Sequence, residues 1–177
     1  MILMSLVMLY NGHIACDKKG CLDDESFLNY PVKKMFVSDD KVFCIAYSGE
    51  LLDEEHCKFI HQQFLLEHIK KIDKEKLHTN IMEKIFFGDC SGIIVFNRQV
   101  YLFNIKAKEK EIKIFLHNEK QNYFFGNGKT ASKVLDNSGK KIPLEKFFKI
   151  VSYSDVTTSA EYDFIKLSDL RKIPKWV

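Results

Sequence analysis

The stretch MSLVMLYNGHIACD, residues 4–17, decides how this chain begins to fold. Two mostly apolar runs, at 5–10 and 13–16, flank the dipeptide Asn11-Gly12. An Asn-Gly pair between two apolar runs is the strongest short-range signal for a β-hairpin with a two-residue turn, because both central residues need a positive φ. We therefore expect an antiparallel hairpin that is followed directly by Asp17.

The apolar run that leads into this hairpin is MILMSLVMLY, at 1–10. It lacks the basic start and the small-residue cleavage site of a signal peptide. Ten residues are also too few to span a membrane. We expect this run to form a buried strand.

The rest of the chain alternates between strand-like and helix-like segments. A second hairpin is expected from strands at 32–37 and 42–47, and apolar residues then recur at helical spacing over 51–72 and 74–86. Further strands are expected at 92–96, 100–105, 112–116, 123–126 and 161–167, and further helices at 129–135 and 144–153. Runs of strands alternating with runs of helices favour layered α+β packing. We expect one domain over residues 1–177, with an irregular tail at 168–177.

The composition excludes several classes of protein. The net charge of +3 is small and no long basic run occurs, so we expect no nucleic-acid partner. An odd number of cysteines without a C-x-x-C motif indicates reduced thiols in a cytoplasmic protein, not disulfides or a zinc site. No phosphate loop, dinucleotide fingerprint or zinc motif is present, so we expect no cofactor and no metal. The five cysteines are Cys16, Cys21, Cys44, Cys57 and Cys90.

Four stretches of the sequence resemble proteasome beta subunits and the bacterial HslV peptidase, in the right order and over residues 5–167. They are YNGHIACDKKG (10–20), VKKMFVSDDKVFCIAYSGELLDEEH (32–56), YFFGNGKTASKVL (123–135) and VSYSDVTTSAEYDFI (151–165). The likeness is closest to short phage-type relatives of that family. The resemblance implies an α+β fold, the four-layer αββα sandwich of N-terminal nucleophile hydrolases. Members of the family cut peptide bonds with an N-terminal threonine or serine whose own α-amine is the base.

The resemblance also implies site residues. The family's acid after the first hairpin falls on Asp17. Its lysine falls on Lys34, or on Lys33 if the second hairpin differs by one residue. The oxyanion-hole glycine falls on Gly49, and a later acid and hydroxyl pair falls on Asp155 and Thr158. The family's Gly-Ser-Gly turn is Gly126-Asn127-Gly128 here, so that Asn127 replaces its serine.

Ser5 is the expected nucleophile. The resemblance implies a nucleophile opposite the acid across the first hairpin. In a two-residue hairpin the numbers of paired residues have a constant sum, so that Asp17 pairs with Leu6, next to Ser5. The chemistry needs a free α-amine on Ser5, which residues 1–4 block. Either translation begins at Met4, whose methionine is removed before the small serine, or residues 1–4 are a propeptide that the protein cleaves itself. We favour the start at Met4.

We therefore expect a hydrolase that cleaves peptides or unfolded proteins and forms a homo-oligomeric ring, without a membrane partner. In this family an ATPase unfoldase is a further partner. Lys34 would keep the Ser5 amine neutral, Asp17 would orient Lys34, and the Gly49 N–H would bind the oxyanion. Two alternatives stay open: a catalytically inactive ring or assembly subunit with this fold, and an amidase that acts on a small molecule.

Overall fold

The structure is a computed structural model that describes residues 2–3, 5–20, 26–27, 30–85 and 88–176. Met4, the expected start of translation, lies outside the described residues, as do Cys21 and Phe86, the expected end of the second helix. Of residues 2–3 only the backbone is described.

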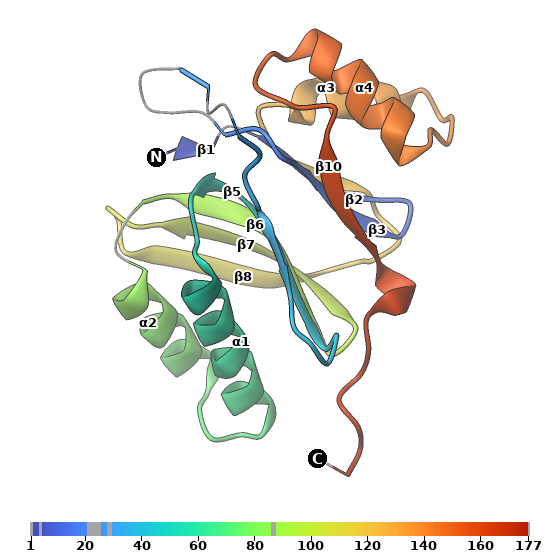
Figure 1. Cartoon of the computed structure of the whole chain (residues 1–177). Helices are drawn as coiled ribbons and strands as arrows, with labels where there is room; N and C mark the ends of the chain where they lie inside the picture. Colours follow the sequence, from blue (N-terminus) through green and yellow to red (C-terminus); the bar gives the residue numbers. More distant parts are fainter. Residues whose placement is uncertain (1, 4, 21–25, 28–29, 86–87, 177) are drawn as a thin grey trace.

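The strands form two antiparallel sheets (Figure 1). The first sheet consists of β1 (Ile2–Leu3), β4 (Met35–Val37), β5 (Phe43–Glu50), β6 (Cys90–Phe96), β7 (Gln99–Lys106) and β8 (Glu111–His117). In it β5, β6, β7 and β8 are neighbours in that order, and both β1 and β4 pair with β5. The second sheet has the order β10 (Tyr162–Lys166), β3 (His13–Asp17), β2 (Leu6–Tyr10) and β9 (Tyr123–Gly126).

The helices lie against the two sheets in pairs. Figure 1 shows α1 (Glu54–His68) and α2 (Lys74–Lys84) beside the first sheet, and α3 (Lys129–Asn137) and α4 (Leu144–Ser154) beside the second. Helix α1 begins later than its apolar pattern predicts, because the Asp53 carboxylate accepts the His56 N–H at 2.8 Å and caps the helix there. A short 3₁₀ turn, η1 (Leu167–Asp169), precedes the tail. Of the described helices, none has the length and apolar character that a membrane span requires.

Three clusters of buried side chains hold these parts together. One joins α1 and α2 to the first sheet and includes Phe43 and Phe64. A second contains residues of both sheets, among them Val7 and Val95. The third joins the second sheet to the last two helices and includes Phe147. The two sheets therefore pack against each other through the second cluster, and β2 lies between two of the clusters.

The first hairpin is confirmed. Asn11 and Gly12 have φ values of 47° and 76°, as the two-residue turn requires. The register pairs Val7 with Cys16 and Tyr10 with His13, and the Leu6 N–H donates to the Asp17 carboxylate at 3.1 Å. Leu6 and Asp17 thus lie opposite each other at the open end of the hairpin.

The expectation that residues 1–10 form one strand is wrong. β1 pairs with β5 in the first sheet, with Leu3 opposite Gly49, whereas β2 belongs to the second sheet. The reason is the short length of β4, which pairs with β5 only at residues 44–46. The edge of β5 at residues 49–50 is then free for another strand, and β1 supplies backbone partners there. The chain therefore passes from one sheet to the other at Ser5.

The expected four-layer αββα sandwich is also wrong as a description of this chain. Its described part supports an α+β fold with two antiparallel sheets and four α-helices. The helices are short, with 9 residues in α3 and 15 in α1. They leave the edge strands uncovered, since Phe115 and Leu116 on β8 remain 52% and 60% exposed and Phe164 on β10 remains 51% exposed. The helices therefore do not form complete outer layers.

Candidate active site

A fully buried ion pair lies where β3 ends. The Lys34 Nζ is 2.8 Å from the Asp17 Oδ1, and neither side chain has any exposed surface. Asp17 is the last residue of β3, and Lys34 directly precedes β4 of the other sheet. The ion pair therefore joins the two sheets close to the point where the chain crosses between them.

Backbone amides surround the Asp17 carboxylate. Its Oδ1 accepts the Leu6 N–H at 3.1 Å, and its Oδ2 accepts the Ser159 N–H at 2.9 Å and the Lys19 N–H at 3.3 Å. Three amide donors and one ammonium donor stabilise the ionised carboxylate. The carboxylate is thus held by four donors, one of which is the N–H of Leu6, the residue that follows Ser5.

Burial moves the pKa values of both members of the pair away from their ordinary values. Desolvation raises the pKa of the Asp17 carboxyl above 3.8, against the opposing effects of Lys34 and of the Ser159 and Leu6 amides. Desolvation also lowers the pKa of the Lys34 amine below 10.5, against the attraction of Asp17. Each charge therefore depends on its partner for its presence in the interior.

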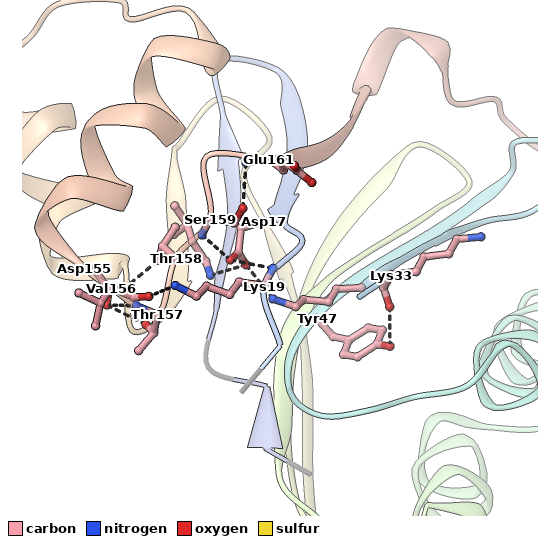
Figure 2. A network of polar contacts seen from close by, with 12 residues as sticks. Asp17, Lys19, Lys33, Tyr47, Asp155, Val156, Thr157, Thr158, Ser159 and Glu161 are labelled. Atoms are coloured by element: carbon pink, nitrogen blue, oxygen red, sulfur yellow. Dashed lines mark hydrogen bonds and ion pairs between the residues drawn. The ribbon is translucent and has the colours of Figure 1, made fainter. Parts of the chain in front are cut away.

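The structure distinguishes between the two candidate lysines. Successive side chains of an extended segment point to opposite sides, so only one of Lys33 and Lys34 can face Asp17. Figure 2 shows the Lys33 side chain pointing away from Asp17, and Lys33 is exposed. Its backbone carbonyl accepts the Tyr47 hydroxyl at 3.4 Å. Lys34 is the lysine that the fold brings to Asp17.

Ser5 is fully buried at the crossing between β1 and β2. Gly126 at the end of β9 packs directly on it, since a Cβ at position 126 would lie 1.7 Å from the Ser5 carbonyl oxygen. The same Cβ would lie 3.1 Å from the Ser48 Oγ. Ser5 and Ser48 therefore approach the same small space, and the absence of a side chain at position 126 makes that approach possible.

Gly49 lies at the edge that β1 occupies. Its φ is +113°, and a Cβ there would be 2.3 Å from the Asp89 carbonyl oxygen, so this position requires glycine. The Tyr47 N–H donates toward β4, to the Lys34 carbonyl, and the Glu50 N–H donates toward β6, to the Asp89 carbonyl. Because amides point alternately to the two sides of a strand, the Gly49 N–H faces the edge where β1 lies.

The loop at 155–159, after α4, lies beside Asp17 (Figure 2). Thr158, which is buried, donates through its Oγ1 to the Asp155 Oδ2 at 2.8 Å, and the Thr157 hydroxyl donates to the Oδ1 at 2.7 Å. These bonds hold the loop in the shape that brings the Ser159 N–H to Asp17. Asp155 and Thr158 thus contact the ion pair through the loop backbone and not directly.

Sequence reasoning missed Lys19, which belongs to the same network. Its Nζ donates to the carbonyl of Val156, as Figure 2 shows, and its N–H donates to Asp17. Its neighbour Lys18 instead forms a partly exposed ion pair with Asp163 at 3.2 Å. The signal that could have identified Lys19 was its position two residues after a buried acid.

Asn127, which replaces a serine of the family pattern, is exposed on the turn after β9. Its neighbour Gly128 packs against the site, since a Cβ there would lie 2.8 Å from the Thr158 Oγ1 and 3.1 Å from the Leu6 Cβ. The two glycines of this turn therefore contact the site, while the Asn127 side chain lies at the surface.

Among solved structures, the chain is similar to those of Anbu proteins. Anbu from Hyphomicrobium sp. strain MC1 has a TM-score of 0.54 and 11% identity, over 92% of this chain and 80% of that one. An Anbu (Gly-1) mutant from the same strain has a TM-score of 0.53 and 12% identity, over the same shares. Anbu (ancestral beta-subunit) from Yersinia bercovieri has a TM-score of 0.49 and 11% identity, over 91% and 79%. No family model and no curated protein matches the sequence.

These findings establish the fold. The chain has the fold of the Hyphomicrobium Anbu structures, a proteasome-like fold. They also correct the resemblance to HslV and to short phage-type relatives, because the structures found are Anbu proteins at 11–12% identity. The reason is physical: a tight hairpin turn, a buried acid and lysine, and close-packed glycines follow from the fold, and do not distinguish between the branches that share it.

Proposed function

We propose that this chain is a peptidase of the N-terminal nucleophile type, with Ser5 as the nucleophile once it is the first residue of the chain. The buried pair of Lys34 and Asp17 carries the proposal, because its carboxylate also accepts the N–H of Leu6, next to Ser5. Burying two charges is costly, and apolar side chains of similar volume often serve stability equally well. Strongly perturbed ionisable groups concentrate at functional sites.

In the proposed reaction the Ser5 Oγ attacks the carbonyl carbon of a peptide bond, and its proton passes to the Ser5 α-amine. The Lys34 ammonium lowers the pKa of that amine, so that the amine is neutral and basic near physiological pH. The Gly49 N–H donates to the oxyanion. The amine then gives its proton to the leaving nitrogen as the C–N bond breaks. Water finally hydrolyses the ester that remains on Ser5.

Asp155, Thr158 and Lys19 act in this proposal as positioning residues. They fix the 155–159 loop, whose Ser159 N–H donates to Asp17 at 2.9 Å. Asp17 in turn orients the Lys34 ammonium. The reacting atoms thus depend on them only through Asp17 and Lys34.

Residues 1–4, an extension or a propeptide, must be absent for this reaction. An acylated nitrogen on Ser5 cannot accept the hydroxyl proton. In the uncleaved chain β1 also pairs with β5, and Leu3 lies opposite Gly49. Removal of the segment would therefore free both the proposed base and the edge toward which the proposed oxyanion donor points.

A hollow of ≈ 310 Å³ beside this edge supports a peptide substrate with an apolar side chain. It lies between β4, the end of β5 and the start of α1, and Leu51, two residues after Gly49, lines it together with Val32 and Tyr47. We propose that it receives the side chain before the cleaved bond.

The proposal includes assembly into a homo-oligomer, to which an ATPase unfoldase would deliver unfolded protein as substrate. Exposed apolar residues on the edge strand β8 support assembly, because unpaired edge strands with apolar side chains favour association with another chain. A second candidate, a catalytically inactive assembly subunit, is favoured by the β1–β5 pairing. In that case β1 would stay on the β5 edge permanently.

The mature N-terminus tests the proposal. The purified, assembled protein should have the intact mass of a chain that begins at Ser5, and it should hydrolyse small peptide amides. A folded assembly that retains residues 1–4 and turns over no peptide supports the inactive subunit instead.

A further inference from the structure

A basic hollow lies at the other end of the strands from Ser5. Its volume is ≈ 630 Å³, and it is formed by the β2–β3 turn, the β6–β7 turn, the β8–β9 connection and the start of η1. Figure 1 shows η1 and the β2–β3 turn side by side at this end. The five residues of β2 separate the hollow from Ser5 by roughly 17 Å at 3.4 Å per residue. The hollow is therefore not part of the candidate active site.

Among the charged side chains that line this hollow, cations outnumber anions. Arg98, Lys120 and Lys166 line it together with one acidic residue, Glu119, and with His13. Among the residues that the structure describes, none of these three cations forms an ion pair with a carboxylate. The hollow thus carries an excess of positive charge.

The distribution of arginine makes this end distinctive. The chain has 27 lysines and arginines, and only Arg98 and Arg171 are arginines. The segment that follows Arg171 runs past the β6–β7 turn, since the Ile173 N–H donates to the Asn97 Oδ1 at 2.8 Å. Both arginines therefore belong to this end of the molecule. Arginine is the side chain best suited to phosphate, because its planar guanidinium donates two parallel hydrogen bonds.

The walls of the hollow are fixed by hydrogen bonds. The Asn122 Oδ1 accepts the Asn11 N–H at 3.0 Å, and the Asn122 Nδ2 donates to Asp136 at 2.8 Å. The Leu167 N–H donates to the Gly12 carbonyl at 2.9 Å. Asn97 and Arg98 have φ values of 52° and 66°, typical of a tight two-residue turn. The side chains thus project from backbone that is already ordered.

We propose that this hollow binds the phosphate chain of a small polyphosphate or nucleoside triphosphate, held by Arg98, Lys120 and Lys166. A site of this volume accommodates a ligand of that size. The ligand would bridge the two sheets, because Arg98 lies on the β6–β7 turn of the first sheet and Lys166 on β10 of the second.

Isothermal titration calorimetry with sodium tripolyphosphate tests this site on the full chain. The unmodified protein should bind the probe at low salt, and sodium chloride should weaken binding. Lys120→Gln, Lys166→Gln and Arg98→Asn should each weaken it about tenfold, as expected for the loss of a charge-assisted hydrogen bond. Asparagine at position 98 keeps the turn, since it tolerates a positive φ.

The triple variant Arg98→Asn/Lys120→Gln/Lys166→Gln should lose binding of tripolyphosphate, and a matched control should not. The control Lys133→Gln/Lys141→Gln/Lys149→Gln removes the same charge from exposed residues in and around α3 and α4. Equal losses in both triple variants, or no binding by the folded unmodified protein at millimolar probe, would overturn the proposal. Tighter binding of ATP than of tripolyphosphate would assign a nucleotide, and equal affinities would assign the free polyphosphate.

Discussion

Asp17 connects most of the candidate site, because its two oxygens accept hydrogen bonds from Lys34, Leu6, Lys19 and Ser159. Its charge is stable in the interior only with the Lys34 ammonium beside it. This dependence of the Asp17 charge on Lys34 can be measured through the free energy of unfolding, without any assay of activity.

Lys34→Met should destabilise the fold by about 3–5 kcal/mol, because it leaves the buried Asp17 carboxylate without its cation. The double variant Asp17→Asn/Lys34→Met should recover most of this loss, because no charge then remains in the interior. Urea unfolding of the two variants and the parent measures these free energies. A double variant no more stable than Lys34→Met would show that the two charges do not compensate each other.

The same pair gives the stability a dependence on pH. The raised pKa of Asp17 makes the folded chain bind the proton more tightly than the unfolded chain, so the free energy of unfolding falls as pH rises from 3.8 through the folded-state pKa. The lowered pKa of Lys34 has the opposite sign, and the free energy of unfolding rises with pH from the folded-state pKa up to 10.5.

The difference in unfolding free energy between the parent and the double variant isolates these two contributions. Plotted against pH, this difference should be lowest between the folded-state pKa of Asp17 and the folded-state pKa of Lys34. The contributions of the other titrating groups cancel in the difference. A difference that stays constant across the whole range would contradict the pKa shifts of the pair.

At this scale the sequence predicted part of the site. Hairpin arithmetic placed Asp17 beside Leu6, since a two-residue turn fixes the register locally. The choice between Lys33 and Lys34 needed the structure, because one residue of register in a separate hairpin reverses both side chains. Lys19 was missed because its partner, the Val156 carbonyl, is 137 residues away.

At the scale of elements, β1 determines what the site can do. The Gly49 N–H faces β1, whereas the Glu50 N–H donates to the Asp89 carbonyl on β6 at 2.8 Å. Removal of residues 1–4 should therefore speed hydrogen exchange at the Gly49 amide and leave the Glu50 amide protected. Mass spectrometry with residue-level fragmentation measures both amides. Faster exchange at Glu50 as well would indicate that the whole end of β5 has loosened.

The elements themselves were largely predictable, because local chemistry defines them. Asn11-Gly12 and Asn97-Arg98 form their turns with positive φ values, and Asp53 and Asp73 cap α1 and α2 through side-chain oxygens. The division of the N-terminal run between two sheets was not predictable. It depends on how far β4 extends along β5, and the pattern of residues 1–10 contains no information about that edge.

At the scale of the whole molecule, the uncovered edge strand β8 predicts association. Phe115 and Leu116 are both more than half exposed there, and in the described part of the chain β8 pairs with β7 alone. Light scattering should give a multiple of the mass of one chain, which is 20.7 kDa for all 177 residues. Phe115→Lys/Leu116→Lys should shift that mass toward the monomer, whereas Val134→Lys/Tyr153→Lys, on exposed residues of α3 and α4, should not. A monomer mass for the unmodified protein at high concentration would contradict the proposed assembly.

The most direct test of the central claim is the rate of peptide-amide hydrolysis by four matched proteins. The first three begin at residue 5 and carry Ser5, Ser5→Thr or Ser5→Ala. The fourth keeps Ser5 and retains residues 1–4. The first three are made as fusions, and cleavage of the fusion partner leaves residue 5 as the first residue of the chain. The account predicts turnover by the Ser5 and Ser5→Thr chains, which keep both hydroxyl and free amine, and none by the other two. Equal turnover by the Ser5→Ala chain, or by the chain that retains residues 1–4, would contradict it.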